Sequence, residues 1–166
     1  MNNLIIKKLV IEDWQIWKNF RLECLKNSPE NFGSSYEEEL DWFDECFQEN
    51  INKNDIFGVF INGIFAAGVG FNRLDSIKTK HIGFMWGMYT KPNYRGNGYA
   101  TLLVEAIIVH AKKYVSQLNL SCVTSNINAL ELYKSKGFVI YGQQPNALKI
   151  QNEYVDAYMM TLALNS

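Results

Sequence analysis

A strand-like run, a short turn and the start of a helix follow one another in the segment Gly87-Met88-Tyr89-Thr90-Lys91-Pro92-Asn93-Tyr94-Arg95-Gly96-Asn97-Gly98-Tyr99-Ala100. The next residues, 101–114, have an apolar spacing that predicts a long helix. A glycine-rich turn that leads into a helix leaves several backbone N–H groups unpaired and pointing one way. Together with the helix dipole, these groups favour a bound phosphate or pyrophosphate at this position.

The rest of the chain predicts short strands and helices in alternation. Asn62-Gly63 stands between two apolar runs and predicts a type I′ hairpin turn. Ser35 and Glu38 have the spacing of a capping box, so a helix is expected to begin there and to carry Leu40, Phe43 and Phe47 on one face. Strands are expected at residues 4–9, 55–61, 64–72, 81–90, 117–124, 138–142 and 154–164, and helices at 11–26, 35–50, 101–114 and 127–136. Residues 143–152 are expected to form a loop or a partial strand, and 149–156 a late hairpin.

This order of elements predicts an α+β protein, with a mixed α/β sheet that has helices on both faces. The strand–helix–strand unit over residues 81–124 is expected to be a right-handed parallel crossover. A length of 166 residues favours one domain over residues 1–166 with a substantial core.

Composition and charge exclude several classes of protein. The net charge of −1 gives no electrostatic case for binding nucleic acid or an anionic membrane surface. Cys24, Cys46 and Cys122 are an odd number of cysteines without metal-ligand spacing, so we expect buried, reduced thiols and no metal site. Neither a signal peptide nor an apolar run of about 20 residues is visible, so a cytoplasmic protein is expected.

Two motifs in register resemble those of the GNAT N-acetyltransferase superfamily. The turn at residues 95–100 fits the acyl-CoA signature Q/R-x-x-G-x-G/A. A second pattern, N-x-x-A…L-Y…K-G-F, is matched by Asn126-Ile127-Asn128-Ala129, Leu132-Tyr133 and Lys136-Gly137-Phe138. Their separation and the order of elements between them also match, and the resemblance covers nearly the whole chain. It implies a central, mostly antiparallel twisted sheet of about seven strands.

The resemblance also assigns the cosubstrate acetyl-CoA to particular residues. The loop from Gly96 through Asn97, Gly98, Tyr99 and Ala100 to Thr101 is expected to wrap the pyrophosphate with backbone N–H groups, and Arg95 to be structural or to contact phosphate. Met88, Tyr89 and Thr90 are expected to hydrogen-bond the pantetheine arm as an added strand would. Asn126 is expected to contact the pantetheine, and its position also suits a helix cap.

The same resemblance assigns a catalytic role to Tyr133, which is expected to protonate the departing thiolate. The alternative is a purely structural role, in which the tyrosine packs its ring in the core. The general base is left open, because the strands around the glycine loop carry no carboxylate where family members often have a Glu. Either a water chain carries the proton or a side chain from elsewhere takes it, and the candidates are Glu37, Glu38, His81 and Asp156.

The expected reaction is acetyl transfer from acetyl-CoA to a primary amine by direct attack in a ternary complex. The acceptor is a small-molecule amine or a peptide, and Phe32 and Tyr36 are candidates for binding it. A protein N-terminal or lysine acetyltransferase and a non-catalytic acyl-CoA sensor stay open as alternatives. Homodimers are common in the family, so a homodimer is also considered. The acidic stretch around Tyr36 is either a pocket for a cationic amine or, preferably, a solvated helix face.

Overall fold

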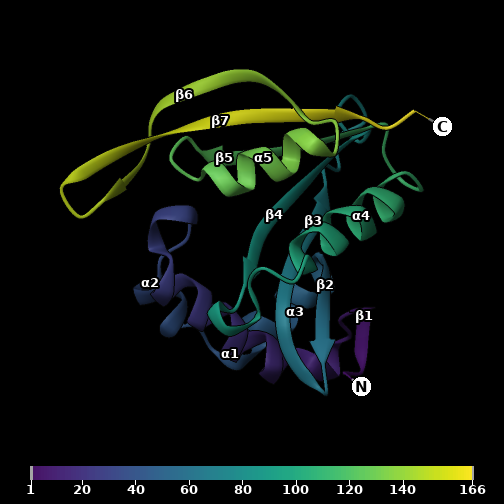
Figure 1. The fold of residues 1–166 in the computed structure, drawn as a ribbon, viewed down its shortest axis with the longest axis vertical. Coiled ribbons are helices and arrows are strands. Elements are labelled where there is room, and N and C mark those ends of the chain that lie inside the picture. Colours follow the sequence, from purple (N-terminus) through teal and green to yellow (C-terminus); the bar gives the residue numbers. More distant parts are fainter. Residues whose placement is uncertain (1, 166) are drawn as a thin grey trace.

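Seven strands form one sheet in the order β1-β2-β3-β4-β5-β7-β6 in the computed structural model, which describes residues 2–165 (Figure 1). The strands are β1 (Leu4–Lys8), β2 (Asp55–Ile61), β3 (Ile64–Arg73), β4 (Ile82–Thr90), β5 (Gln117–Val123), β6 (Val139–Ile150) and β7 (Glu153–Ala163). Neighbouring strands pair antiparallel except β4 and β5, which are parallel. The predicted mixed, mostly antiparallel sheet and the predicted parallel pair are therefore confirmed.

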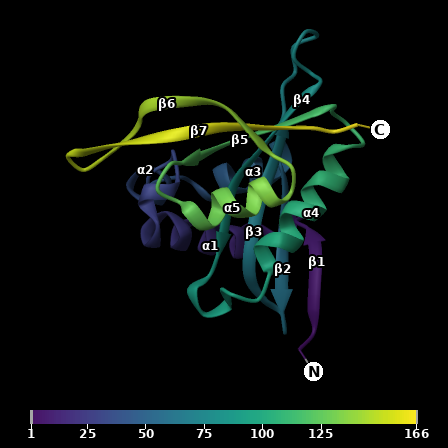
Figure 2. The same cartoon turned by 45° about the horizontal axis from the view of Figure 1, so that its top comes forward.

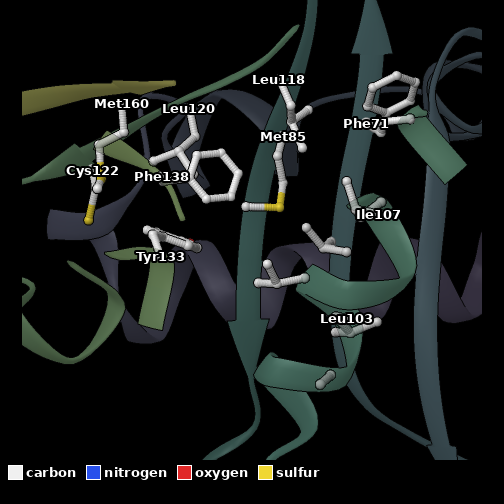
Figure 3. Packing of buried hydrophobic residues seen from close by; sticks show 14 of the residues in the cluster. Phe71, Met85, Leu103, Ile107, Leu118, Leu120, Cys122, Tyr133, Phe138 and Met160 are labelled. Carbon is white, nitrogen blue, oxygen red and sulfur yellow. The ribbon is translucent and has the colours of Figure 1, made fainter. Parts of the chain in front are cut away.

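Helices cover both faces of this sheet (Figure 2). They are α1 (Trp14–Asn27), α2 (Tyr36–Leu40), α3 (Asp44–Lys53), α4 (Tyr99–Ala111) and α5 (Ile127–Ser135), with short 3-10 turns η1 (Ile11–Asp13), η2 (Pro29–Asn31) and η3 (Pro92–Tyr94). One buried cluster lies between the sheet and α4 and α5, and includes Leu103, Ile107 and Phe138 (Figure 3). A second cluster with Trp17, Phe20 and Phe47 lies under α1 and α3 on the opposite face.

The hairpin turn and the helix cap that the sequence predicted are both present in the structure. Asn62 and Gly63 have φ of 50° and 82°, as a turn with positive φ at both central residues requires. The Ser35 hydroxyl accepts a hydrogen bond of 3.2 Å from the backbone N–H of Glu38, which caps α2.

The predicted single helix over residues 35–50 is wrong. The structure has two helices, α2 and α3, separated at Asp41–Phe43, and Leu40 and Phe43 are 49% and 78% exposed instead of buried with Phe47. Glu39, by contrast, is only 2% exposed. Its carboxylate binds Arg21 of α1, so α2 turns Glu39 inward while Glu37, Glu38 and Leu40 stay exposed.

The segment left open as a loop or partial strand belongs to β6, which pairs with β7 in the expected hairpin. The register shifts between Gln144 and Leu148, so the residues around Pro145 stand outside the regular ladder. Because β6 is the last strand of the sheet, a proline that cannot donate a hydrogen bond is tolerated there. No helix within residues 2–165 is both long enough and apolar enough to cross a membrane.

Candidate active site

A cleft opens in the sheet where the parallel strands β4 and β5 diverge. Their shared ladder has only three register pairs, Ile82↔Gln117, Gly83↔Leu118 and Phe84↔Asn119. Beyond these pairs, residues 85–90 of β4 have no strand partner on the β5 side. An unpaired strand edge presents a row of N–H and C=O groups that an extended ligand can pair with.

A β-bulge interrupts the opposite edge of β4, where the strand pairs with β3, at the level of the cleft. In the ladder with β3, Gly68 pairs with Tyr89 and Gly70 with Trp86, so Gly87 and Met88 both stand opposite the single residue Val69. Gly87 has φ of +69°, a backbone conformation that side chains with a Cβ rarely adopt. The bulge takes one residue of β4 out of the β3 ladder, in the same stretch of the strand that has no partner on the β5 side.

The glycine loop lies at the end of β4. Gly96 and Gly98 both have φ of +78°, no atom lies within 4 Å of a Cβ built on either, and Gly98 is the N-cap of α4. The loop is fixed from within, because Arg95 Nε donates to the carbonyl of Thr90 at 3.0 Å and Asn97 Nδ2 donates to the carbonyl of Tyr94 at 3.0 Å. The result is an open backbone surface at a helix N-terminus.

A cavity of about 400 Å³ joins this loop to the edge of β4, and we call it the loop cavity. Most of the predicted site residues line it together, namely Phe32, Met88, Tyr89, Thr90, Arg95, Gly96, Gly98, Tyr99, Ala100, Asn126 and Tyr133. Asn97 and Thr101 are not among its lining residues, although both belong to the adjoining loop and helix. Tyr36 lines neither this cavity nor the two described next, and its ring lies under Lys26.

Tyr133 lies where the loop cavity reaches the cleft. Its side chain comes from α5, packs edge-on against Phe138 at a centroid distance of 5.9 Å, and is 6% exposed (Figure 3). None of the hydrogen bonds among residues 2–165 uses its hydroxyl. Burial, with a smaller effect from Cys122, raises the pKa of the Tyr133 phenol, so the hydroxyl keeps its proton throughout the neutral range.

Asn126 is the N-cap of α5 and also lines the loop cavity. Its side-chain oxygen accepts a hydrogen bond of 3.4 Å from the backbone N–H of Ala129, so it caps α5. The same residue lines the loop cavity. The cap therefore fixes the first turn of the helix that carries Tyr133.

A narrow passage of about 50 Å³ runs through the cleft, and its lining includes Met88, Cys122 and Tyr133. On its far side lies a second cavity of about 400 Å³, which we call the far cavity. The lining residues of the far cavity come from α1, the η2 loop and strands β4 to β7, and are Arg21, Asn31, Phe32, Gly33, Ser34, Phe84, Met85, Trp86, Gly87, Leu120, Ser121, Val123, Gln144, Ala147, Leu148 and Ala157. Asn31 and Phe32 line all three spaces, so the η2 loop marks the junction.

The four candidate bases lie apart from these spaces. Glu37, Glu38, His81 and Asp156 line none of the three. His81 instead lines an open depression of about 600 Å³ at the other end of β4, beside Arg73 and Lys80. This larger hollow shares no residue with the cleft.

The structure adds three residues that the sequence reasoning missed, namely Arg21, Asn31 and Trp86. Arg21 had a visible signal, since it stands four residues after Trp17 and three before Cys24 on the apolar face of α1. A cation on an apolar stripe requires a partner or a ligand. Within residues 2–165 no group of three or more His, Cys, Asp or Glu side chains could hold a metal ion.

Comparison with known families and structures agrees with this geometry. A model described as the acetyltransferase (GNAT) family matches residues 14–138. No curated protein sequence matches the chain.

Solved structures share the fold along almost the entire chain. A GNAT-family acetyltransferase from Streptococcus pneumoniae is 24% identical, with a TM-score of 0.87 over 98% of this chain and 100% of that one. The structure of yncA from Salmonella typhimurium with its cofactor acetyl-CoA is 16% identical, with a TM-score of 0.80 over 99% of this chain and 95% of that one. The ribosomal-protein-S18-alanine N-acetyltransferase from Escherichia coli is 21% identical, with a TM-score of 0.73 over 100% and 96%.

Proposed function

Since the chain belongs to the GNAT acetyltransferase family, we propose that it transfers an acetyl group from acetyl-CoA to a primary amine. One observation carries this proposal. The glycine loop, the free edge of β4 and the hydroxyl-bearing Tyr133 line a single cavity, which meets a second cavity through the cleft. Two substrates that enter from opposite faces of the sheet would meet in the narrow passage between them.

The residues of the loop cavity fit acetyl-CoA. Backbone N–H groups at Gly96, Gly98 and the first turn of α4 suit the pyrophosphate, because a glycine has no side chain to keep a phosphate away from the backbone. The unpaired edge of Met88, Tyr89 and Thr90 suits the amides of the pantetheine arm, which would add to β4 like another strand. The bound molecule supplies the thioester, and its acetyl end would lie at the passage.

Two groups of the chain assist the transfer. Backbone N–H groups at the Gly87–Met88 bulge are suited to stabilise negative charge on the acetyl oxygen. The Tyr133 hydroxyl, which stays protonated and makes no other hydrogen bond within residues 2–165, would give its proton to the departing thiolate. The acceptor of that proton is the thiolate, whose thiol form has an ordinary pKa of about 8.5, and solvent would then return a proton to Tyr133.

The amine attacks directly, without an acylated protein side chain. Cys122 is the cysteine that lines the passage, and burial raises the pKa of its thiol to about 11. At neutral pH almost none of it is thiolate, which is the reactive form. No Asp or Glu within residues 2–165 lines the passage or the far cavity, so the proton of the incoming ammonium leaves through water in the far cavity.

The test is thiol release from acetyl-CoA with a panel of small amines and short peptides, combined with mass spectrometry of both products. The proposal expects acetylated amine in amounts equal to the thiol released. It also expects no acetyl adduct on the intact chain when acetyl-CoA is added alone. Tight binding of coenzyme A without turnover of any amine would indicate the non-catalytic sensor instead. Turnover restricted to peptides would favour the protein acetyltransferase.

A further inference from the structure

The far cavity combines an apolar wall with one buried cation. Apolar side chains such as Leu120, Leu148 and Ala157 form much of its lining. Arg21 is the one Lys or Arg among its lining residues, and no Asp or Glu joins it there within residues 2–165. The side chain of Arg21 is only 9% exposed. A buried guanidinium at a cavity wall presents hydrogen-bond donors and no acceptors to whatever enters.

The guanidinium is held in place and only partly used. Arg21 Nε and Nη2 donate to the two carboxylate oxygens of Glu39, each at 2.9 Å. Its plane also lies near the rings of Phe32 and Trp86, with distances of 5.9 and 5.6 Å from Cζ to the centroids. A bidentate pair between aromatic rings fixes the orientation of the group before any ligand binds.

Nη1 is the nitrogen that remains. None of the hydrogen bonds among residues 2–165 uses it. Among residues 2–165, Trp86 Nε1 is the fully buried side-chain nitrogen or oxygen that has no hydrogen-bond partner. Arg21 Nη1 also has no partner among these residues but is not fully buried, so solvent reaches it. The Trp86 nitrogen is enclosed and offers nothing to a ligand, whereas Nη1 offers two donors at the cavity.

The position of Nη1 relates it to the reacting end of the cleft. A Cβ built on Gly87 would lie 3.5 Å from Nη1, so the guanidinium stands beside the bulge of β4. The amine must attack near this bulge. An anionic group bound at Nη1 would therefore be close to the amine in the same molecule.

Resting on the proposed function, we infer that the acceptor is an α-amino acid with an apolar side chain. A single carbon separates its amine from its carboxylate, which matches an amine at the bulge and a carboxylate on Arg21 Nη1. The side chain would lie against Leu120, Leu148 and Ala157. A polyamine or a lysine side chain would bring a second cation to Arg21. A peptide N-terminus would bring an amide in place of the carboxylate.

The experiment compares L-leucine, L-methionine and L-phenylalanine with their decarboxylated amines, and with spermidine, as acceptors. The variant Arg21→Met/Glu39→Gln removes both charges together, so Glu39 is not left as a buried unpaired anion. Lys18→Met/Asp44→Asn is the matched control, because it removes a pair between α1 and α3 that lines neither cavity. Thermal melts and coenzyme A affinity establish that each variant is folded.

We expect wild type to prefer each amino acid over its decarboxylated amine in kcat/KM. The ratio of kcat/KM for the amino acid to kcat/KM for its decarboxylated amine falls about 10- to 100-fold in Arg21→Met/Glu39→Gln, as loss of a charge-assisted hydrogen bond predicts. The same ratio stays unchanged in the control. Equal or better turnover of the decarboxylated amines or spermidine, or an unchanged ratio in the Arg21 variant, overturns the inference while acetyl transfer stands.

Absence of turnover with every acceptor would instead defeat the proposed function. Calorimetry with the coenzyme A-loaded protein then decides the inference separately. L-leucine that binds to wild type and not to the Arg21 variant supports the carboxylate site. Failure of all three amino acids to bind wild type overturns it.

Discussion

Phe84 of β4 and Asn119 of β5 are the last register partners of the parallel pair, and the two strands diverge from this point. The divergence has a consequence on each side of the sheet. The loop cavity lies where α4 and α5 begin, and the far cavity lies between α1 and the β6–β7 hairpin. Each cavity is built from elements distant in the sequence, and the small passage is the place where they communicate.

Gly98→Ala is expected to weaken coenzyme A binding by about tenfold or more. Its φ of +78° strains a residue with a Cβ by about 1 kcal/mol, and the added methyl group would stand on the surface expected to face the phosphates. Calorimetric titration with coenzyme A measures the change.

Gly63→Ala is the matched control for this substitution. Gly63 has φ of +82° and equally open surroundings, but lies in the β2–β3 turn away from the loop cavity. Both variants should lose similar stability, and Gly63→Ala should keep its coenzyme A affinity. Equal affinity losses in the two would show that the glycine loop does not hold the cosubstrate.

Tyr133→Phe is expected to lower kcat about 100-fold or more while the affinity for coenzyme A changes little. Stability should change by less than about 0.5 kcal/mol, because the hydroxyl makes no hydrogen bond within residues 2–165. Burial raises the pKa of Tyr133, so the acid form persists as pH rises, and any loss of activity between pH 7 and 9 must come from another group. If Tyr133→Phe keeps the wild-type kcat, the side chain of Tyr133 serves only in packing.

Arg21 and Glu39 are expected to show strong coupling in stability. Their side chains are 9% and 2% exposed, so removing one partner leaves a buried charge without compensation. Glu39→Gln alone should cost about 3–5 kcal/mol in denaturant unfolding, and the double variant Arg21→Met/Glu39→Gln should cost clearly less than the sum of the single changes. If the stability losses of the two single variants instead add up to that of the double variant, the two side chains are hydrated separately in solution and do not form the pair.

Asp55 is expected to make stability depend on acid pH. Burial alone would raise the pKa of its carboxyl, but hydrogen bonds and charge from Lys8 and His110, at 2.6 and 2.7 Å, outweigh it and hold the pKa below its usual 3.8. The stabilisation is complete above the unfolded pKa of about 3.9 and is lost as pH falls through the lower folded value. Melting temperatures of wild type and Asp55→Asn should therefore differ at pH 7, and the difference should begin to shrink as pH falls below about 4. A difference that does not depend on pH would contradict this.

Features that depend on neighbours in the chain were predicted well from the sequence. The turn at Asn62 and Gly63, the cap at Ser35 and the glycine loop before α4 each require particular backbone angles or a hydrogen bond over three residues. Such requirements restrict the residue types at each position, so the sequence carries them directly. The predicted residues of the loop cavity came from these patterns and from the family resemblance.

Contacts between particular side chains or strand positions that are distant in the sequence were missed. Arg21 and Glu39 are 18 positions apart, and their pairing places Glu39 of α2 in the interior, whereas Leu40 is exposed. At the bulge, Gly87 and Met88 of β4 stand opposite the single residue Val69 of β3. The sequence of β4 alone does not reveal this register. The far cavity was therefore the least predictable part, since its walls come from six separate elements.

The most direct test of the proposed acetyltransferase site is a crystal structure with coenzyme A bound, read at the distance from its sulfur to Tyr133 Oη. We predict hydrogen-bond range, about 3–4 Å for a sulfur partner, with the pyrophosphate at Gly96 and Gly98 and the arm along Met88 to Thr90. A coenzyme A molecule bound in the depression beside His81, or a sulfur that points away from Tyr133, would contradict it.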